Sequence, residues 1–188
     1  VVTVHDVAFM RFPEFIEDAN YRYLTRHIRT TVDRADAVIA VSEFVAQEIR
    51  DLLPIAEDRV FAVPHGIDSR FRRPADIAIA EMRGELGLDA PYLLHVGTIE
   101  PRKNLAFLID VFENLPDFDG LLVLAGGIGW KCRPLRDKIR SSPRAKDIRL
   151  LHYVADRHLP ALYAGAEAFV FPSHYEGFGF PPLEAMAC

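Results

Sequence analysis

The sequence predicts an α/β fold with parallel sheets. Short apolar runs typical of strands covered on both faces alternate along the whole chain with segments of helical periodicity. The runs lack the apolar/polar alternation of a half-exposed strand, and each is too short to be a buried helix. The predicted strands lie within residues 1–7, 37–42, 60–64, 92–98, 120–126, 148–154 and 168–172.

Helical patterns fill most of the segments between these runs. Over 21–35 an apolar face carries Leu24, Ile28 and Ala35, and a basic face carries Arg22, Arg26 and Arg29. Ser42 and Asn104 are residue types that cap helices, so we expect them to begin helices over 43–53 and 105–115. Two further helices are predicted at 131–141 and 157–165.

The stretch 64–80 interrupts the alternation with a glycine, two prolines and a cluster of charges. We interpret it as a linker between two α/β units. Residues 1–75 then hold part of the first unit together with the linker, and residues 76–188 hold part of the second. The opening run already resembles a buried strand, and no start methionine precedes it, so we expect an internal piece of a longer protein.

Composition excludes several classes of protein. The net charge of −5 disfavours nonspecific nucleic-acid binding, which depends on basic side chains. Cys132 and Cys188 lie far apart without metal-type spacing, so a disulfide framework is not expected and a reducing compartment is favoured. No apolar run approaches the length that spans a bilayer. The basic face at 21–35 could meet anionic lipid, but we favour a solvated face.

Ligands of open parallel sheets bind outside the carboxyl ends of the strands. The segments that follow four successive runs are "GTIEPRKN", "GGIGW", "HYVADRH" and "PSHYEGFGF", and all four are expected at one edge of one sheet. Arg102 and Lys103 stand in the first of them, directly before a predicted helix. Two cations beside free backbone N–H groups suit an anion, although a solvated pair in a turn is an equal alternative.

The closing stretch "YEGFGFPPLEAMAC" carries two glutamates, Glu176 and Glu184, eight positions apart. Gly177 and Gly179 permit positive φ and a close approach of ligand to backbone. The Pro-Pro pair suits the first turn of a helix, whose dipole would favour an anion. We expect Glu184 in that first turn, where its carboxylate could bind a ribose diol. A charge that only stabilises the helix start is the simpler alternative for Glu184.

Three other polar or glycine-rich features give weaker evidence of a functional site. His5 ends the first run and is either catalytic or a buried structural histidine. The "DFD" at 117–119 precedes a strand, so we expect a turn rather than a metal site. "GGIGW" lacks the spacing of a dinucleotide fingerprint, which favours a tight strand–helix turn.

Four segments together resemble the retaining nucleotide-sugar glycosyltransferases of GT-B fold, known as group 1 or family 4. They are "VPHGID", "GTIEPRKN", "LVLAGGIGW" and the final stretch, in which the spacing of Glu176 and Glu184 is the hallmark. The resemblance implies two Rossmann-like domains, both incomplete in this chain. The first would lie on the acceptor side, and the second would hold the nucleotide sugar.

The resemblance also implies roles for individual residues. Arg102 and Lys103 would bind the donor diphosphate, Glu184 the ribose, and Glu176 the donor sugar. His5 would lie near that sugar. The catalytic set would be His5, Arg102, Lys103 and Glu176. The donor-binding set would be Gly97, Arg102, Lys103, Val154, Glu176, Gly177, Phe178, Gly179, Phe180 and Glu184.

The family pattern implies no metal and no further cofactor, because basic side chains and helix N-termini take the charge of the leaving group. Two departures bear on the roles of single residues. Thr98 stands where many members carry an arginine, and His65 replaces a common asparagine. With segments of both domains missing, this piece alone is expected to be a poor enzyme.

The expected reaction moves a sugar from a nucleotide-diphosphate donor to a saccharide or lipid-linked acceptor. "GTIEPRKN" resembles bacterial mannosyltransferases and favours GDP-mannose, while UDP-sugars stay open. The alternatives are another GT-B enzyme, such as a sugar-nucleotide epimerase, and a nonenzymatic nucleotide-binding module. The resemblance implies a cytoplasmic protein, with peripheral association at the inner membrane face left open and nucleic acid excluded.

Overall fold

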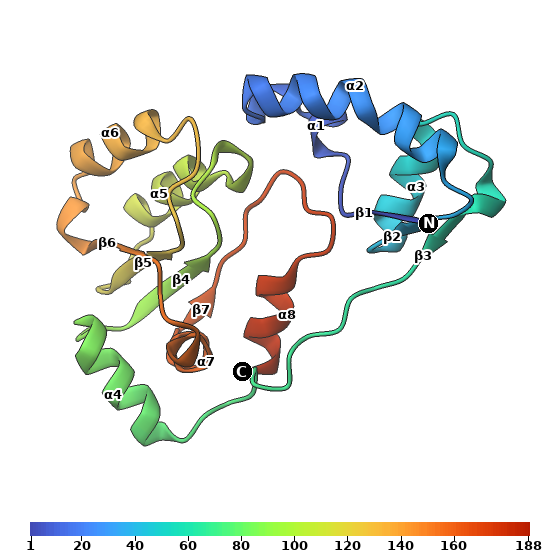
Figure 1. Cartoon of the computed structure of the whole chain (residues 1–188). Coiled ribbons are helices and arrows are strands. Elements are labelled where there is room, and N and C mark those ends of the chain that lie inside the picture. Colours follow the sequence, from blue (N-terminus) through green and yellow to red (C-terminus); the bar gives the residue numbers. More distant parts are fainter. The chain divides into compact units, whose positions relative to one another are not determined.

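The structure is a computed structural model that describes residues 1–188, and it contains two parallel β-sheets (Figure 1). The chain divides into two compact units. Unit 1 comprises Val1–Gly66 and Tyr175–Gly179, and unit 2 comprises Ile67–His174 and Phe180–Cys188. All seven predicted strands are present, and every strand pair is parallel, so the predicted α/β class is confirmed.

Unit 1 has a three-stranded sheet in the order β1-β2-β3. Its elements are β1 (Val2–Val4), α1 (Ala8–Arg11), η1 (Pro13–Phe15), α2 (Asp18–Arg34), β2 (Val38–Ala40), α3 (Glu43–Leu52), η2 (Glu57–Arg59) and β3 (Val60–Ala62). The apolar face of α3, with Val45 and Ile49, shares one buried core with the strands. Ser42 caps α3 as predicted, because its Oγ accepts a hydrogen bond from the backbone N–H of Val45 at 3.1 Å.

Helix α2 agrees with the sequence pattern in part. The basic face, with Arg22, Arg26 and Arg29, is exposed. Ala35 is buried and Ile28 partly buried against the core, but Leu24 is exposed and lines an open groove of about 390 Å³ beside β1. The predicted apolar face is therefore wrong at Leu24. No helix in the chain has both the length and the apolar character needed to cross a membrane.

Unit 2 has a four-stranded sheet in the order β6-β5-β4-β7. Its strands are β4 (Tyr92–Val96), β5 (Leu121–Ala125), β6 (Ile148–His152) and β7 (Ala168–Phe169). Its α-helices are α4 (Asp76–Leu86), α5 (Leu105–Glu113), α6 (Arg133–Ser141), α7 (Leu159–Ala164) and α8 (Phe180–Ala187). Three short 3₁₀ helices are η3 (Pro101–Lys103), η4 (Ala145–Asp147) and η5 (Asp156–His158).

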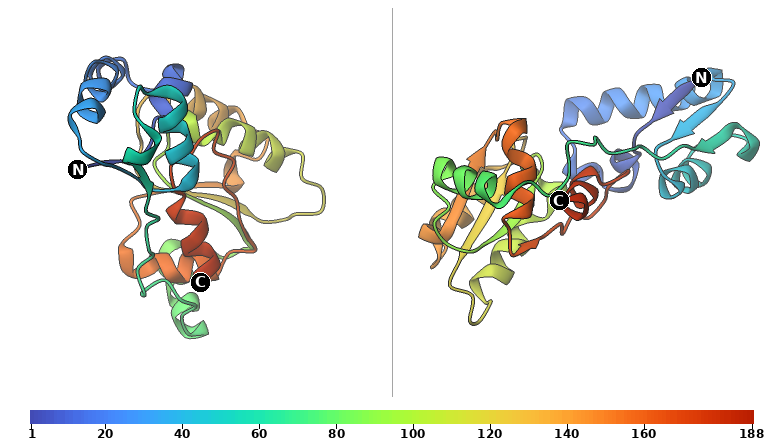
Figure 2. Two further views of the ribbon diagram at one scale, coloured as in Figure 1. Left: turned by 90° about the vertical axis from the view of Figure 1, so that its right-hand side faces the viewer. Right: turned by 90° about the horizontal axis from the view of Figure 1, so that it is seen from below.

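Helices cover both faces of this sheet, and β5 shows the reason. Its side chains alternate between two cores, as successive residues of a strand must. Leu121 and Val123 join the core beneath α4 and α7, whereas Leu122 and Leu124 join the core beneath α5 and α6. Both faces are therefore apolar, and the run carries no polar alternation. Figures 1 and 2 show the two sets of helices on opposite sides of the strands.

Two local predictions hold only in part. The stretch 64–80 is predicted to be a linker, and residues 64–75 contain no helix or strand. However, α4 begins at Asp76 and ends at Leu86, and Gly87 directly after it adopts the left-handed conformation. A glycine inside this helix, Gly84, and its weak amphipathic pattern hide it in the sequence. Asn104 precedes α5, but its φ of 56° is left-handed and its side chain makes no capping hydrogen bond. The "DFD" segment does form a turn, with Asp117 at φ 60°.

The carboxyl ends of β4 and β5 come into direct backbone contact. Gly126 follows β5 with φ +146°, and a Cβ atom there would lie 2.0 Å from the carbonyl oxygen of Gly97. Only glycine leaves room for such an approach. The next residue, Gly127, has open space within 4 Å of the place where a Cβ would stand, and its φ is not in the left-handed range.

Replacing Gly126 with alanine should lower the free energy of unfolding of the full-length protein by about 3 kcal/mol or more, because the methyl group meets backbone and strains φ. The matched change Gly127→Ala should alter it by less than about 0.5 kcal/mol. Urea unfolding of both variants measures the difference. Equal effects of the two changes would contradict the close contact.

Candidate functional site

The carboxyl ends of all four strands of unit 2 lie at one edge of its sheet. The pairing is parallel, and β4 is in register with both β5 and β7. The segments that follow β4, β5, β6 and β7 therefore gather at this edge, as predicted from the strand order. This carboxyl edge holds Gly97, Arg102, Lys103 and Val154.

Hydrogen bonds join the first two of these segments. The N–H of Ile99 donates to Gly127 O at 2.8 Å, and the N–H of Gly129 donates back to Ile99 O at 2.9 Å. The thiol of Cys132 donates to the same Ile99 carbonyl at 2.8 Å. "GGIGW" is thus a tight strand–helix connection, as expected. Its glycines serve to hold the neighbouring segment in place.

Lys103 is buried at this edge, with only 7% of its surface exposed. Its Nζ lies 5.1 Å from the ring centroid of Phe171, a distance suited to a cation–π contact. Gly97, with φ +151°, would place a Cβ 3.6 Å from Cε of Lys103. Because Gly97 has no side chain, only its backbone lies beside the ammonium group of Lys103. A solvated lysine in a turn, the alternative expectation, is not what the structure has.

Arg102 is held by a carboxylate that the sequence pattern does not single out. Its guanidinium group donates to Glu100 Oε1 at 2.6 Å, and the Glu100 side chain is only 3% exposed. The backbone carbonyl of Arg102 accepts from the N–H of His174 at 2.9 Å, which ties the segment after β7 to the same place. Both basic residues lie directly before α5, so they can act together on an anion.

His95 is a second residue that the sequence pattern does not reveal. It is fully buried in β4, and its Nδ1 lies 3.1 Å from the carbonyl oxygen of Val170, which can only accept. Nδ1 therefore carries a proton and donates it to that carbonyl. Nε2 lies 3.5 Å from the Cβ position of Gly97, on the side where Lys103 also approaches. A single histidine in the apolar run "YLLHVG" was the available signal.

Val154 and Glu184 both lie at the core of unit 2 that contains Tyr163. Val154 follows β6 and is buried in the core that α4 and α7 cover. Glu184 is predicted in the first turn of its helix, but α8 begins at Phe180 and has no acidic residue in its first turn. It stands in the second turn, where its Oε2 accepts a hydrogen bond from the hydroxyl of Tyr163 at 2.7 Å.

Unit 1 carries the other predicted residues. His5 directly follows β1, and its ring stacks on His65 with centroids 5.7 Å apart. His65 in turn meets the edge of Phe178 at 5.2 Å. His5 is thus part of an aromatic cluster with the segment Tyr175–Gly179, to which Glu176 also belongs.

The role expected of Gly177 needs correction. A Cβ atom there would lie 2.1 Å from the carbonyl oxygen of His5, so the chain's own backbone, rather than a ligand, occupies the space. The hydroxyl of Ser42 donates to Gly177 O at 2.6 Å and fixes the same segment. Gly179 does adopt a positive φ of 88°, as expected. Phe180, the next residue, opens α8 in unit 2.

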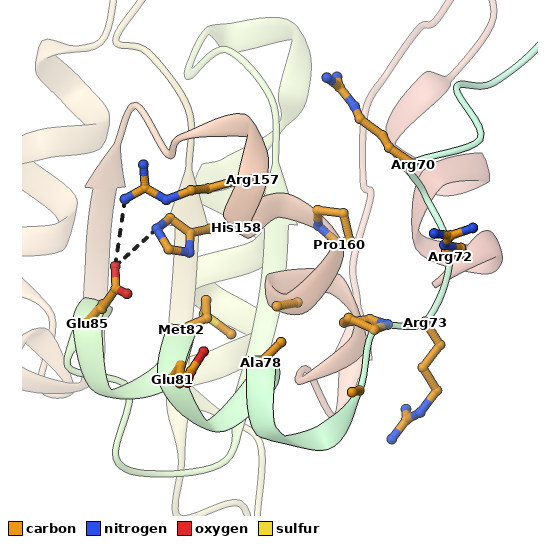
Figure 3. A pocket seen from close by; sticks show the side chains of 13 residues that line it. Arg70, Arg72, Arg73, Ala78, Glu81, Met82, Glu85, Arg157, His158 and Pro160 are labelled. Atoms are coloured by element: carbon orange, nitrogen blue, oxygen red, sulfur yellow. Dashed lines mark ion pairs between the residues drawn. The ribbon is translucent and has the colours of Figure 1, made fainter.

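A surface pocket of about 550 Å³ between α4 and α7 also collects basic residues (Figure 3). Arg157 and His158 both reach Glu85, at 3.9 and 3.2 Å. Arg70 and Arg73 point away from each other (Figure 3) and pair with nearby aspartates. The guanidinium groups do not converge, so this pocket is a weaker anion site than the carboxyl edge. No three His, Cys, Asp or Glu side chains are grouped to hold a metal ion.

Comparison with known proteins yields two family models. The model described as "Glycosyl transferases group 1" matches residues 79–188, and "Glycosyltransferase Family 4" matches residues 1–71. The chain is 36% identical to O-antigen chain mannosyltransferase B of Escherichia coli, over 100% of the chain and 50% of that protein. It is 27% identical to O-antigen chain mannosyltransferase RfbU of Salmonella typhimurium, over 99% of the chain and 49% of that protein.

Solved structures share the fold at lower identity. A sucrose-phosphate synthase from Thermosynechococcus elongatus superposes with a TM-score of 0.81 at 24% identity, covering 100% of the chain and 48% of that protein. Anabaena HepE in complex with UDP-glucose gives 0.80 at 22%, covering 100% and 50%. The predicted GT-B fold is confirmed. The chain spans about half the length of the curated relatives named above.

Burial raises the pKa of the Cys132 thiol above its ordinary value, so the thiolate is scarce at neutral pH. Alkylation of Cys132 by iodoacetamide in the native protein should be at least about tenfold slower than in the unfolded chain, and should accelerate as pH rises. Peptide mapping by mass spectrometry measures both rates. Equal rates in the folded and unfolded states would show that the two segments at the carboxyl edge are not closed together.

Proposed function

Because the chain belongs to the group 1 family of glycosyl transferases, we propose that its protein transfers a sugar from a nucleotide-diphosphate sugar to a saccharide or lipid-linked acceptor. The proposed transfer keeps the anomeric configuration of the donor. The acceptor hydroxyl attacks the anomeric carbon on the same face of the sugar from which the phosphate leaves. The bond between the anomeric carbon and the phosphate oxygen breaks, and a new glycosidic bond forms. The proton of the acceptor hydroxyl passes to the departing phosphate.

The observation that carries this proposal is the buried cation at the carboxyl edge of unit 2. Burying an ammonium group costs free energy, and such groups are concentrated at functional sites. Lys103 lies beside bare backbone at Gly97, and Arg102 next to it is held in one orientation by Glu100. Fixed positive charge of this kind stabilises a diphosphate as it leaves, without a metal ion.

Other residues of unit 2 would bind the rest of the nucleotide. Glu184 offers carboxylate oxygens to the two ribose hydroxyls. The backbone near Val154 would contact the base. The amides at the start of α8, around Gly179 and Phe180, suit phosphate oxygens because a helix N-terminus favours anions.

The sugar side of the proposal involves unit 1. We propose that His5 and Glu176 contact the donor sugar, with the backbone of Phe178 beside it. His5 is held by stacking on His65, which would keep its ring in one orientation during the reaction.

We propose GDP-mannose as the donor. Support comes from the O-antigen mannosyltransferases among the relatives, one of them at 36% identity over the whole chain. UDP-sugars are the alternative, because backbone contacts to the base carry little preference and HepE, a protein of the same fold, is known with UDP-glucose. An epimerase or a nonenzymatic nucleotide-binding module would bind the nucleotide but fail to transfer the sugar.

In the full-length protein, Glu184→Ala should weaken nucleotide binding by about 10- to 100-fold, because a charged acceptor of two hydrogen bonds is lost. The control Glu167→Ala removes an exposed glutamate at the amino end of β7, away from the carboxyl edge of the sheet. It should leave the affinity unchanged. Calorimetry with GDP and UDP measures both. If wild-type protein binds neither nucleotide, the proposed function is wrong.

Lys103→Ala should lower kcat by about 100-fold or more while changing donor affinity less, since the charge acts mainly on the leaving group. Lys146→Ala, at a lysine before β6 and away from the carboxyl edge, is the matched control and should keep full activity. Transfer and donor hydrolysis are followed with a panel of GDP- and UDP-sugars. Equal loss in both variants, or an unchanged kcat in Lys103→Ala, contradicts the assigned role.

A further inference from the structure

The hydroxyl of Tyr163 makes a hydrogen bond that joins α7 to the Glu184 side chain on α8. It donates to Glu184 Oε2 at 2.7 Å, and both residues belong to unit 2. Tyr163 is 5% exposed, while Glu184 is only partly buried. The buried tyrosine thus contacts a glutamate that is itself still partly exposed.

Tyr163 is a permanent hydrogen-bond donor. Burial, and next the hydrogen bond to the charge of Glu184, raise the pKa of its hydroxyl above the ordinary value for tyrosine. The group therefore keeps its proton throughout the physiological pH range. A carboxylate can only accept, so the tyrosine hydroxyl is the donor of this bond.

The position of the hydroxyl is set by packing. The Tyr163 ring meets Phe169 edge to face at 5.5 Å and Phe71 at 6.1 Å. It is part of the core that α4 and α7 form with the sheet. Because the ring is clamped between two other rings, it cannot follow the glutamate if that side chain turns. The glutamate must instead come to the tyrosine.

The hydrogen bond leaves enough acceptor capacity for a diol. A carboxylate has about four lone-pair sites, and Tyr163 uses one of those on Oε2. Oε1 and the second site of Oε2 stay available for the two neighbouring hydroxyls of a ribose. Without the tyrosine, the same glutamate would lose rotamer freedom on binding, which weakens the interaction.

We propose that Tyr163 is a positioning residue for nucleotide recognition, which holds the carboxylate of Glu184 in the orientation that accepts both ribose hydroxyls. This inference rests on the proposed function, since it assigns Glu184 to the ribose. Tyr163 acts through Glu184 and does not touch the nucleotide. Its effect is therefore expected on the discrimination between ribose and deoxyribose, more than on nucleotide binding in general.

The test compares Tyr163→Phe with Tyr92→Phe in the full-length protein. Tyr92 is a matched control because it is fully buried in the same core and donates its hydroxyl to Leu162 O, also at 2.7 Å. Calorimetry measures the affinities of each variant for GDP and 2′-deoxy-GDP, and for the corresponding uridine nucleotides. Tyr163→Phe should weaken ribonucleotide binding by about 3- to 10-fold and weaken deoxyribonucleotide binding, in which only the 3′-hydroxyl remains to be accepted, by less. Tyr92→Phe should leave the preference for ribose as in wild type.

The possible outcomes test the role of Tyr163 separately from the proposed function. If Tyr163→Phe keeps the wild-type preference for ribose, or weakens both kinds of nucleotide equally, the tyrosine is structural and the inference is wrong. The proposed function would survive that result. If wild-type protein binds no nucleotide, the function and the inference fail together. Thermal unfolding of both variants checks that a loss of affinity is not a loss of fold.

Discussion

The architecture of unit 2 depends on one contact between two backbones. Where β4 and β5 end, the missing side chain of Gly126 lets the carbonyl of Gly97 approach to a distance that no other residue would tolerate. With the two strand ends this close, the segments beyond them can pair through Ile99. That pairing fixes the start of η3, and so determines where Arg102 and Lys103 stand. A steric constraint at one glycine thus sets the position of two charges.

Charge burial at the carboxyl edge follows from the same arrangement. Lys103 and Glu100 are 7% and 5% exposed, and a fold selected only for stability would place apolar groups there. Specific contacts reduce the free-energy cost of burying these two charged side chains. Glu100 pairs with Arg102, and Lys103 faces the aromatic ring of Phe171. The buried ring of His95 lies at the same edge, with its Nδ1 hydrogen-bonded to the carbonyl of Val170.

Much of this fold could be predicted from the sequence, because strands covered on both faces have an unmistakable apolar pattern. The cap at Ser42 could be predicted as well, since a hydroxyl before an amphipathic segment has a local role. The failures have local causes too. A glycine within α4 concealed that helix, and Asn104 adopts a left-handed conformation in which its side chain makes no capping hydrogen bond.

For the candidate site, sequence order was enough to group residues at the carboxyl edge, but not to identify their partners. Tyr163 and His95 stand in apolar stretches of the sequence, like ordinary core residues. Only their hydrogen bonds in the structure distinguish them from such residues. The contact of Gly177 with His5 joins positions far apart in the chain. Without coordinates, a glycine that makes room for protein cannot be told from a glycine that makes room for a ligand.

The segment Tyr175–Gly179 has a consequence for how such proteins could exchange parts during evolution. It belongs to unit 1, although the chain on both sides of it belongs to unit 2. Recombination near residue 67 would therefore carry five residues of unit 1 along with the second half of the protein. A foreign first half would have to supply a carbonyl at the place of His5 and a hydroxyl at the place of Ser42. The two halves are separate modules in sequence order, but they must be inherited as a matched pair.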